Sequence, residues 1–383
     1  MNILFVLNGH KFVSYFYEPL AQYANSLGSE VDLVLPKFGK FNDSQWPLSS
    51  NKPSKIELVR NPFNLIGFLV EIFQRSFIPQ KTDILHVVTT HMIFLCILRI
   101  AIRVEKFNGL FLMHFIGLGR YFGTKGVFPF VLKFFFKLIW KYRKKENVAY
   151  KCVYLNDEDL TFLKSIFGEK NIKYLKVPGA GVRLDQFEFN YVPIDQPLKL
   201  LFLGRLIKEK GIEKFLYLVD DLNNHTKFQV SCDIVGEFED SAYKKKIMNL
   251  IQDLELKKVI RLIGGVEKPS KFYEAAHFFI FPSYYGEGVP TVLNESQYCG
   301  TPCLASDIAG CREAIENKIT GYLVPSDQRN DWFNKFKEMA ESKNYEKMCY
   351  AAHERVKEKF DAKKLAKRTI DWTIKEFEEF LVR

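Results

Sequence analysis

The chain has 383 residues, enough for two domains of ordinary size that each bury a core of their own. Hydrophobic residues make up 47% of the sequence and charged residues 26%, which excludes a wholly disordered protein. The formal net charge of +10 favours an anionic partner: nucleic acid, an acidic membrane surface or a phosphorylated substrate.

The seven cysteines are scattered without a Cys-x-x-Cys pair, and the chain begins with an alternating strand pattern rather than a basic leader and cleavage site. We therefore expect reduced thiols and a cytoplasmic protein. The apolar run from Met92 to Ile102 is interrupted by Arg99 and is shorter than the roughly 18 residues needed to span a bilayer. We expect it to form a buried helix.

Strand and helix patterns alternate through the first half of the chain, which predicts a doubly wound parallel sheet with helices on both faces. The predicted strands are Asn2–Asn8, Glu30–Pro36, Ile56–Arg60, Asp83–Thr89, Gly109–Phe115 and Tyr150–Leu155. The predicted helices are Tyr15–Leu27, Leu65–Phe77, Met92–Val104, a long helix that ends near Lys145, and Asp157–Phe167.

The alternation restarts at Lys199 after a linker expected at Tyr191–Pro197, so the sequence predicts a second Rossmann-like domain and a ligand cleft between the two. Its predicted strands begin at Lys199, Val230, Ile260, Phe278 and Pro302. We place the domains at residues 1–190 and 198–362. The last stretch, residues 363–383, is predicted to be a helix with one apolar stripe.

The stretch from Phe281 to Gly300 combines a buried strand, a glycine turn and a helix that opens near a proline. Backbone N–H groups at the start of such a helix attract an anion, and a glycine lets a ligand approach the main chain. Glu287 and Glu295 stand on either side of this turn, separated by seven residues. This pattern resembles the signature of the retaining glycosyltransferases of family four.

The resemblance implies the GT-B fold: two Rossmann-like domains that face a cleft, with a terminal helix that crosses back to the first domain. It implies that Glu287 touches the donor sugar and that Glu295 holds the ribose hydroxyls. Phe202 to Arg205, followed by Lys210, resembles the family's first strand and loop, in which an Arg and a Lys bind the donor diphosphate. Fixed cations there would stabilise the charge of the leaving group.

Gly236 and Val266 stand at two further strand ends and resemble the family's base-binding region, so the resemblance implies further donor contacts there. We assign donor binding to Gly9, Gly236, Val266, Gly288, Val289 and Pro290. The alternative is that Glu287 and Glu295 are the acid and the nucleophile of a glycoside hydrolase. A fully helical spacing would separate them by about 12 Å, further than the roughly 5 to 9.5 Å used by glycosidases.

His114, Gly117 and Gly119 follow a predicted strand of the first domain. They resemble a segment of family members that extend undecaprenyl-diphosphate-linked sugars in O-antigen, capsule or glycoprotein glycan synthesis. We expect His114 to contact the donor sugar or the acceptor, with a structural histidine as the alternative. Asp157 to Asp159 also fit the Asp-x-Asp pattern of metal-dependent transferases. These acids stand at a helix start, however, where acids are expected to cap the helix and offset its dipole. We therefore predict no metal ion and no cofactor.

The predicted helix before Lys145 carries the basic stripe Lys133, Lys137, Lys141 and Lys144 beside a wide aromatic arc. This composition suits a helix that lies on an anionic membrane surface, and equally a core helix with a solvated basic face.

The sequence therefore predicts a retaining glycosyltransferase that uses a uridine-linked donor and a lipid-linked saccharide acceptor at the inner membrane surface, without nucleic acid. A nucleotide-sugar epimerase of the same fold is the first alternative. A basic membrane-surface scaffold or a nucleic-acid-binding protein is the second.

Overall fold

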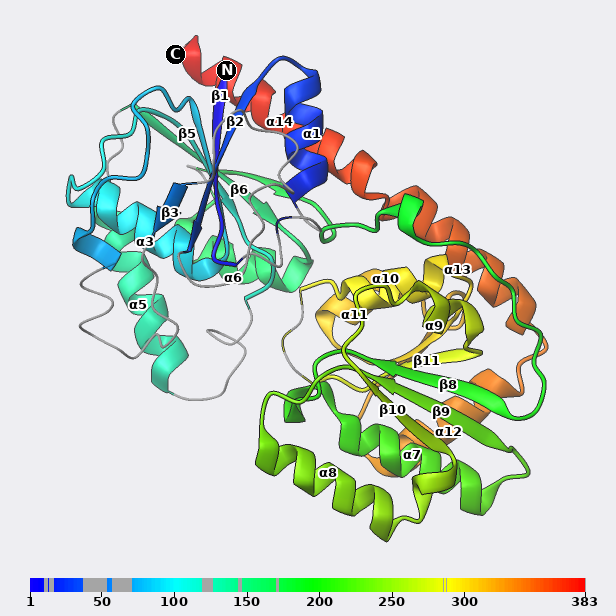
Figure 1. Ribbon diagram of the computed structural model, residues 1–383. Helices are drawn as coiled ribbons and strands as arrows, with labels where there is room; N and C mark the ends of the chain where they lie inside the picture. The colour runs from blue at the N-terminus through cyan, green and yellow to red at the C-terminus, as the bar shows by residue number, and fades with distance from the viewer. Residues whose placement is uncertain are drawn as a thin grey trace. The chain divides into compact units, whose positions relative to one another are not determined.

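The computed structural model describes residues 1–9, 13, 17–36, 54–56, 71–118, 127–143, 147–169, 172–284, 286 and 288–382. The chain divides into two compact units, Met1–Ala180 with Ala362–Arg383, and Gly181–Asp361. Each unit is built on one parallel sheet (Figure 1).

The first sheet has the strand order β3-β2-β1-β4-β5-β6-β7, and every neighbouring pair is parallel. Its strands are β1 (Asn2–Val6), β2 (Glu30–Pro36), β3 (Ser54–Ile56), β4 (Ile84–Val88), β5 (Gly109–His114), β6 (Val148–Tyr154) and β7 (Lys173–Lys176). Its described helices are α1 (Glu18–Ser26), α3 (Thr90–Ala101), α5 (Val127–Tyr142), α6 (Asp157–Phe167) and α14 (Ala362–Leu381).

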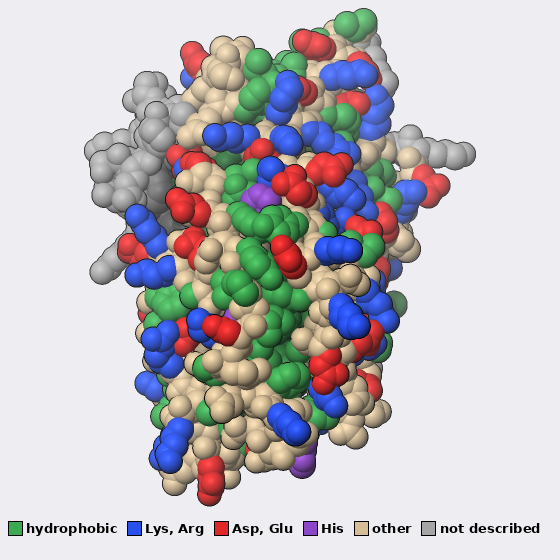
Figure 2. Space-filling model, turned by 90° about the vertical axis from the view of Figure 1, so that its right-hand side faces the viewer, with side chains coloured by type: hydrophobic (Ala, Val, Ile, Leu, Met, Phe, Trp, Pro, Cys, Tyr) green, Lys and Arg blue, Asp and Glu red, His purple; other side chains and the backbone are tan. Residues whose placement is uncertain are grey.

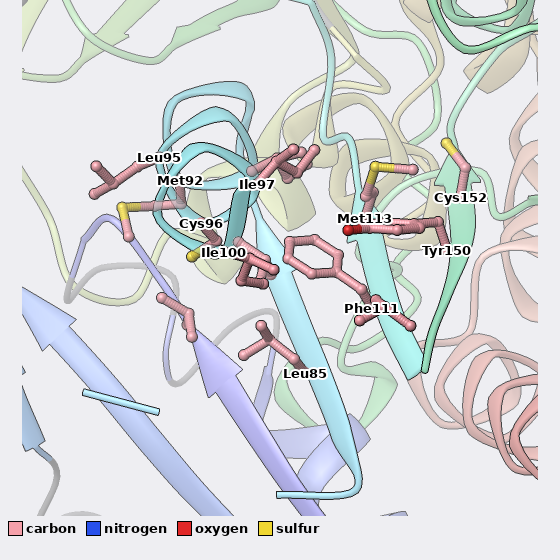
Figure 3. Packing of buried hydrophobic residues seen from close by; sticks show 14 of the residues in the cluster. Leu85, Met92, Leu95, Cys96, Ile97, Ile100, Phe111, Met113, Tyr150 and Cys152 are labelled. Carbon is pink, nitrogen blue, oxygen red and sulfur yellow. The ribbon is translucent and has the colours of Figure 1, made fainter. Parts of the chain in front are cut away.

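Apolar side chains on both faces of this sheet explain why its strands read as almost continuous hydrophobic runs. Helices α3, α5 and α6 cover one face, where Cys96 and Ile100 of α3 point toward Leu85 and Phe111 of the strands (Figure 3). Helices α1 and α14 cover the other face. The C-terminal helix α14 therefore packs with the N-terminal unit.

Ion pairs also hold α14 to this unit. Glu376 is buried between Lys151 of β6 and Lys173 of β7, and the Lys173 Nζ lies 2.9 Å from its carboxylate. A buried carboxylate needs such partners, because desolvation disfavours an unpaired charge.

The second sheet has the order β10-β9-β8-β11-β12-β13 and is also parallel. Its strands are β8 (Leu198–Leu203), β9 (Val230–Val235), β10 (Ile260–Gly264), β11 (Phe278–Phe281), β12 (Cys303–Ser306) and β13 (Gly321–Val324). Its helices are α7 (Ile212–His225), α8 (Ser241–Asp253), α9 (Ser270–Ala275), α10 (Thr291–Tyr298), α11 (Ala309–Ala314), α12 (Arg329–Ala340) and α13 (Tyr345–Lys359). This is the Rossmann strand order, with its switch point between β8 and β11.

The predicted linker at Tyr191–Pro197 lies inside the second unit. Asn190 donates its backbone N–H to the Cys299 carbonyl at 2.9 Å, and the Tyr191 ring stacks on Tyr350 with ring centroids 6.1 Å apart. These contacts join residues 181–197 to the second unit, so the division falls after Ala180 rather than after residue 190.

Several predicted elements fall partly outside the described residues. The predicted strand at Ile56–Arg60 is described only to Ile56, where β3 ends, and the predicted helix at Leu65–Phe77 only from Glu71. The seven cysteines all lie in described ranges and are buried as free thiols. Among the described helices, none is both long enough and apolar enough to cross a bilayer.

Candidate functional site

Three adjacent strands of the second sheet end at glycines, and these glycines lie against one another. Gly204 donates its N–H to the Val235 carbonyl at 3.0 Å, and Gly236 donates to the Gly264 carbonyl at 2.8 Å. A Cβ atom at Gly236 would lie 1.8 Å from the Gly204 carbonyl oxygen, so no other residue fits there. The ends of β8 and β9 therefore pack backbone against backbone, whereas at Gly204 and Gly264 nothing lies within 4 Å of a Cβ position and the main chain is open to a ligand.

Arg205 follows the first of these glycines and is half exposed. Its Nη1 lies 3.1 Å from the Glu239 Oε1. The loops that carry the two side chains are joined by the hydrogen bond from the Leu206 N–H to the Glu237 carbonyl at 2.9 Å. The guanidinium is therefore held at the glycine edge by a partner that is itself open to solvent.

Lys210 lies in a short 3-10 turn that is tied to the loop after β11. Its Nζ lies 5.1 Å from the centroid of the Phe281 ring at the end of that strand. The Glu209 carbonyl accepts the Tyr284 N–H at 3.1 Å and the Ser283 hydroxyl at 3.3 Å. These contacts place the second cation beside the switch point, where open parallel sheets bind their ligands.

Helix α10 begins at Thr291, after the buried residues Val289 and Pro290. No side chain caps its first turn, so the N–H groups there suit an anion. Glu295 is 3% exposed and accepts a hydrogen bond from the Tyr273 hydroxyl at 2.9 Å. Gly288 is described and half buried, whereas Glu287 lies outside the described residues.

The predicted base-binding positions also follow this edge. Val266 comes two residues after the end of β10 and is 38% exposed. At Gly265 a Cβ atom would lie 2.8 Å from the Glu237 Oε1, so the Glu237 side chain lies over this glycine. In the second unit Arg205, Gly236 and Val266 thus follow the ends of the neighbouring strands β8, β9 and β10, and Lys210 lies in the turn after β8.

Two buried histidines meet near the carboxyl edge of the first sheet. The Nε2 of His86 in β4 lies 3.0 Å from the Nδ1 of His114, the last residue of β5. Burial lowers the pKa of His114 to about 3 and lowers the pKa of His86 well below its usual range. Both rings are therefore neutral at physiological pH.

Two other predicted residues follow strands of the first sheet. Gly9 comes after β1, and Gly117 comes after β5 with φ of +102°. This left-handed backbone favours glycine. The predicted residue Gly119 lies outside the described residues.

Helix α5 presents a large apolar surface to solvent. Phe136 and Trp140 are buried in the core of the first unit. Among the α5 side chains that the structure describes, the exposed apolar ones are Phe130, Phe134, Phe135, Leu138 and Tyr142, with exposed fractions of 75%, 58%, 47%, 38% and 66%. We call these five residues the α5 apolar patch. Isolated exposed apolar residues are normal, whereas a contiguous aromatic group of this kind marks an interaction surface.

The predicted basic stripe accompanies this patch. Lys137 and Lys141 are exposed, and the Lys133 Nζ lies 5.0 Å from the centroid of the Phe162 ring. Lys144 lies outside the described residues. On the face drawn in Figure 2, by contrast, basic and acidic side chains are interspersed. The net charge of +10 is therefore not gathered on that face.

The acids Asp157, Glu158 and Asp159 form the first turn of α6, where Asn156 accepts the Asp159 N–H at 2.8 Å as the N-cap. Burial, with a smaller contribution from Glu158, raises the pKa of Asp159 to about 7. Asp157 pairs with Lys176 at 3.1 Å. In the described part of the chain, no group of three His, Cys, Asp or Glu residues could hold a metal ion.

A groove of about 460 Å³ crosses the second sheet away from these residues. It is lined by Lys199, Ser231, Asp233, Arg261 and Phe272 among others, so it lies over the β8, β9 and β10 strands and not at their glycine edge. Arg261 forms a two-pronged ion pair with Asp233 inside it, at 2.8 and 2.6 Å. This groove therefore contains none of the predicted site residues.

Sequence reasoning missed three partners of the predicted residues: His86, Tyr273 and Glu239. Each lies between 22 and 34 positions from the residue that it contacts. Glu239 alone had a sequence signal, because it lies in the loop after β9; His86 lies in the middle of β4 and Tyr273 inside α9.

The two parallel sheets of Rossmann order, with α14 returned to the first unit, define the GT-B fold. Solved structures agree. Sucrose-phosphate synthase (tll1590) from Thermosynechococcus elongatus matches with a TM-score of 0.74 and 18% identity, over 99% of this chain and 100% of that chain. Anabaena Alr3699/HepE in complex with UDP and glucose matches with a TM-score of 0.71 and 14% identity, over 97% and 98%. The predicted fold is confirmed.

Residues 185–356 match the family model described as glycosyl transferases group 1. An N-acetylgalactosaminyltransferase of Campylobacter jejuni, which acts on N,N'-diacetylbacillosaminyl-diphospho-undecaprenol, is 23% identical over 56% of this chain and 57% of its own length. The matches span about half the length of the curated relatives or less. The group 1 match thus covers nearly the whole of the second unit, and the resemblance to family four is confirmed.

Proposed function

We propose that the protein transfers a sugar from a uridine-linked nucleoside-diphosphate donor to a lipid-linked saccharide, with retention at the anomeric carbon. The observation that supports this proposal is the gathering of Arg205, Lys210 and the start of α10 around the β8/β11 switch point of the second unit. These are two cations and an uncapped helix start, the chemistry that binds a diphosphate.

In this proposal Arg205 and Lys210 stabilise the charge that develops on the diphosphate as the sugar departs. Fixed cations at such a position typically contribute about 10²- to 10³-fold in rate. Glu287 would contact the donor sugar. Glu295, whose carboxylate is oriented by the Tyr273 hydroxyl, would hold the ribose hydroxyls. The glycines at the ends of β8, β9 and β10 would let the nucleotide lie against the backbone.

Retention requires no attack by a protein carboxylate in this scheme. The acceptor hydroxyl approaches on the face of the leaving group, and the departing diphosphate takes its proton. The protein then contributes positioning and electrostatic stabilisation. No metal ion or cofactor is expected. His114 would donate a hydrogen bond to the donor sugar or to the acceptor.

We place the acceptor at an anionic bilayer, with the protein peripheral to the inner face of the cell membrane. The α5 apolar patch together with Lys137 and Lys141 supports this placement. Aromatic side chains favour the interfacial region of a bilayer, and each lysine near an anionic surface contributes about 1 kcal/mol. The relative from Campylobacter jejuni carries an undecaprenol-linked substrate in its name.

The donor is identified by measuring thermal unfolding of the protein in the presence of a panel of nucleoside-diphosphate sugars. A bound donor raises the melting temperature by mass action. We expect a uridine-linked sugar to protect the unmodified protein and to lose this effect in Lys210→Ala. Lys208→Ala, in the same turn, is the matched control and should retain protection. Equal protection in both variants would contradict the assignment of Lys210.

The acceptor is examined by transfer of radiolabelled sugar from the protecting donor to undecaprenyl-diphosphate-linked saccharides. The anomeric configuration of the product, compared with that of the donor, tests whether the reaction proceeds with retention. Turnover of the donor alone, without a glycosylated lipid, would favour an epimerase.

Membrane placement is examined with vesicles that contain anionic lipid. We expect Phe134→Ser combined with Phe135→Ser to reduce vesicle binding at least about tenfold, because two aromatic side chains leave the interface. Phe73→Ser is the control, since Phe73 is 67% exposed in the same unit but lies outside the α5 apolar patch. Unchanged binding of the double variant would contradict the placement.

A further inference from the structure

The end of β9 lies between the two places that hold the proposed donor. Arg205 lies just after β8 and Val266 just after β10, and β9 is the strand between β8 and β10 in the sheet. In the proposed function Arg205 binds the diphosphate, and the resemblance to family four places the base beside Val266. A nucleotide that reaches from one to the other must therefore cross the end of β9, where Gly236 and Glu237 stand.

The backbone after β9 directs the side chain of Glu237 away from the core. The Leu206 N–H donates to the Glu237 carbonyl at 2.9 Å, and Leu206 forms a parallel bridge with Phe238, so this stretch is extended. Phe238 packs against the core of the second unit, with its ring centroid 6.5 Å from that of Tyr243. Successive side chains of an extended chain point to opposite sides. Glu237 therefore points away from this core, and it is exposed.

The Glu237 carboxylate lies over the turn that follows β10. A Cβ atom at Gly265 would lie 2.8 Å from the Glu237 Oε1, 2.9 Å from its Cγ and 3.0 Å from its Cδ. The end of the side chain therefore rests on Gly265, which directly precedes Val266. The carboxylate is thus beside the expected position of the base, at the end of the nucleotide away from the diphosphate.

In the described part of the chain, no cation and no hydrogen-bond donor pairs with the Glu237 carboxylate. Two acids close to it in sequence differ in this respect, since Asp233 pairs with Arg261 at 2.6 Å and Glu239 pairs with Arg205 at 3.1 Å. An ionised carboxylate only accepts hydrogen bonds. Glu237 therefore offers a charged acceptor at the base position that no protein group uses.

We propose that Glu237 recognises the nucleobase of the sugar donor by accepting a hydrogen bond from a ring N–H group. This inference rests on the proposed function, in which the donor is linked to uridine. Uracil has a ring N–H at N3, and guanine has one at N1. Cytosine and adenine have a lone pair at the corresponding ring nitrogen, which a carboxylate repels. Glu237 therefore selects uracil or guanine against cytosine and adenine, through a charge-assisted hydrogen bond.

Calorimetric titration of the full chain with three nucleotides tests this role. Uridine diphosphate has the ring N–H, whereas cytidine diphosphate and N3-methyluridine diphosphate lack it. Because a hydrogen bond to a charged group changes affinity by about tenfold or more, we expect uridine diphosphate to bind at least about tenfold more tightly than either analogue. Glu237→Ala should weaken the binding of uridine diphosphate by a similar factor and leave N3-methyluridine diphosphate within about twofold.

Two further variants separate base recognition from a general effect of charge. Glu237→Gln keeps a neutral acceptor and should retain part of the preference for uridine diphosphate. Glu358→Ala removes another exposed carboxylate of the second unit, from α13, and should retain all of it. An equal loss of affinity for all three nucleotides in Glu237→Ala would overturn the proposal. Should Glu237→Ala fail to fold, unchanged preference in Glu237→Gln, or no preference in the unmodified protein, would overturn it as well.

The failure of this inference and of the proposed function give different results. A full preference for uridine diphosphate in Glu237→Ala would overturn the inference and leave a uridine-linked donor in place. Tighter binding of guanosine diphosphate than of uridine diphosphate, lost in Glu237→Ala, would support the role of Glu237 and replace uridine by guanosine in the proposed function. Binding of no nucleoside diphosphate to the unmodified protein would overturn both.

Discussion

The α-carbon of Gly211 faces the carbonyl oxygen of Pro282, and a Cβ atom on Gly211 would lie 2.1 Å from that oxygen. Gly211 also has φ of +76°, in the left-handed region. It ends the turn of Lys210, while Pro282 follows β11 directly. This contact sets the distance between the second cation and the loop that leads to α10.

We therefore expect Gly211→Ala to reduce the free energy of unfolding by about 2 kcal/mol or more, since left-handed strain and a steric clash add. Gly264→Ala is the matched control for stability: φ is +82° in the same unit, and nothing lies within 4 Å of the new Cβ. The free energy of unfolding of Gly264→Ala should fall by only about 1 kcal/mol, which is the cost of the left-handed backbone strain. Urea unfolding of both variants measures the difference, and equal losses would contradict the close contact.

Much of the fold could be predicted because buried parallel strands read as apolar runs. The short strands β7 (Lys173–Lys176) and β13 (Gly321–Val324) were not predicted, because lysines bound the first and a glycine opens the second, so neither reads as an apolar run. The domain boundary was placed too late in the chain. The aromatic contacts of Tyr191 that decide it join residues far apart in sequence.

The residues of the candidate site also divide into those that a local sequence pattern predicts and those that depend on a distant partner. Arg205 and Lys210 could be predicted, because a strand, a glycine and a nearby cation form a local pattern. His86 could not, because its only distinguishing feature is a partner 28 positions away. A histidine inside an apolar strand has no local signal that separates a structural role from a functional one.

Glu239 competes with a diphosphate for Arg205, whose Nη1 it contacts at 3.1 Å. Both side chains are about half exposed, so the pair contributes only about 0.2 to 1 kcal/mol. Glu239→Gln should release the guanidinium and remove a repulsive carboxylate. We expect the Kd for uridine diphosphate to fall by about two- to fivefold.

Calorimetric titration at low ionic strength measures this change. Glu338→Gln is the control, because it removes the same charge from an exposed acid of the second unit that pairs with Lys318. Weaker binding in Glu239→Gln would show that Glu239 orients Arg205 instead of competing for it.

Tyr273 holds the buried carboxylate of Glu295 through a hydroxyl hydrogen bond of 2.9 Å. Tyr273→Phe removes this donor and leaves the ring in place. Because a hydrogen bond to a buried charged group contributes about 1.5 to 3 kcal/mol, we expect a stability loss in that range and a higher KM for the donor. Tyr298→Phe, three residues beyond Glu295 in α10, is the control. An unchanged KM in Tyr273→Phe would separate Glu295 from donor binding.

The buried histidine pair makes the stability of the protein sensitive to acid. His86 and His114 have lowered pKa values in the folded state, while the unfolded chain titrates near pH 6.5. Between about pH 6.5 and pH 3 the unfolded state therefore binds more protons than the folded state. The free energy of unfolding falls as the pH drops through this window, by up to about 1.4 kcal/mol per pH unit for each histidine.

Replacement of His86 by Phe removes one of these protons, so we expect its stability to fall less steeply below pH 6.5 than that of the unmodified protein. Denaturant midpoints at pH 7.5, 6 and 5 measure the slope. His225→Gln, at the exposed C-terminal end of α7, controls for the loss of an ordinary histidine and should keep the steep slope. Parallel profiles for His86→Phe and the unmodified protein would mean that His86 is protonated in the folded state.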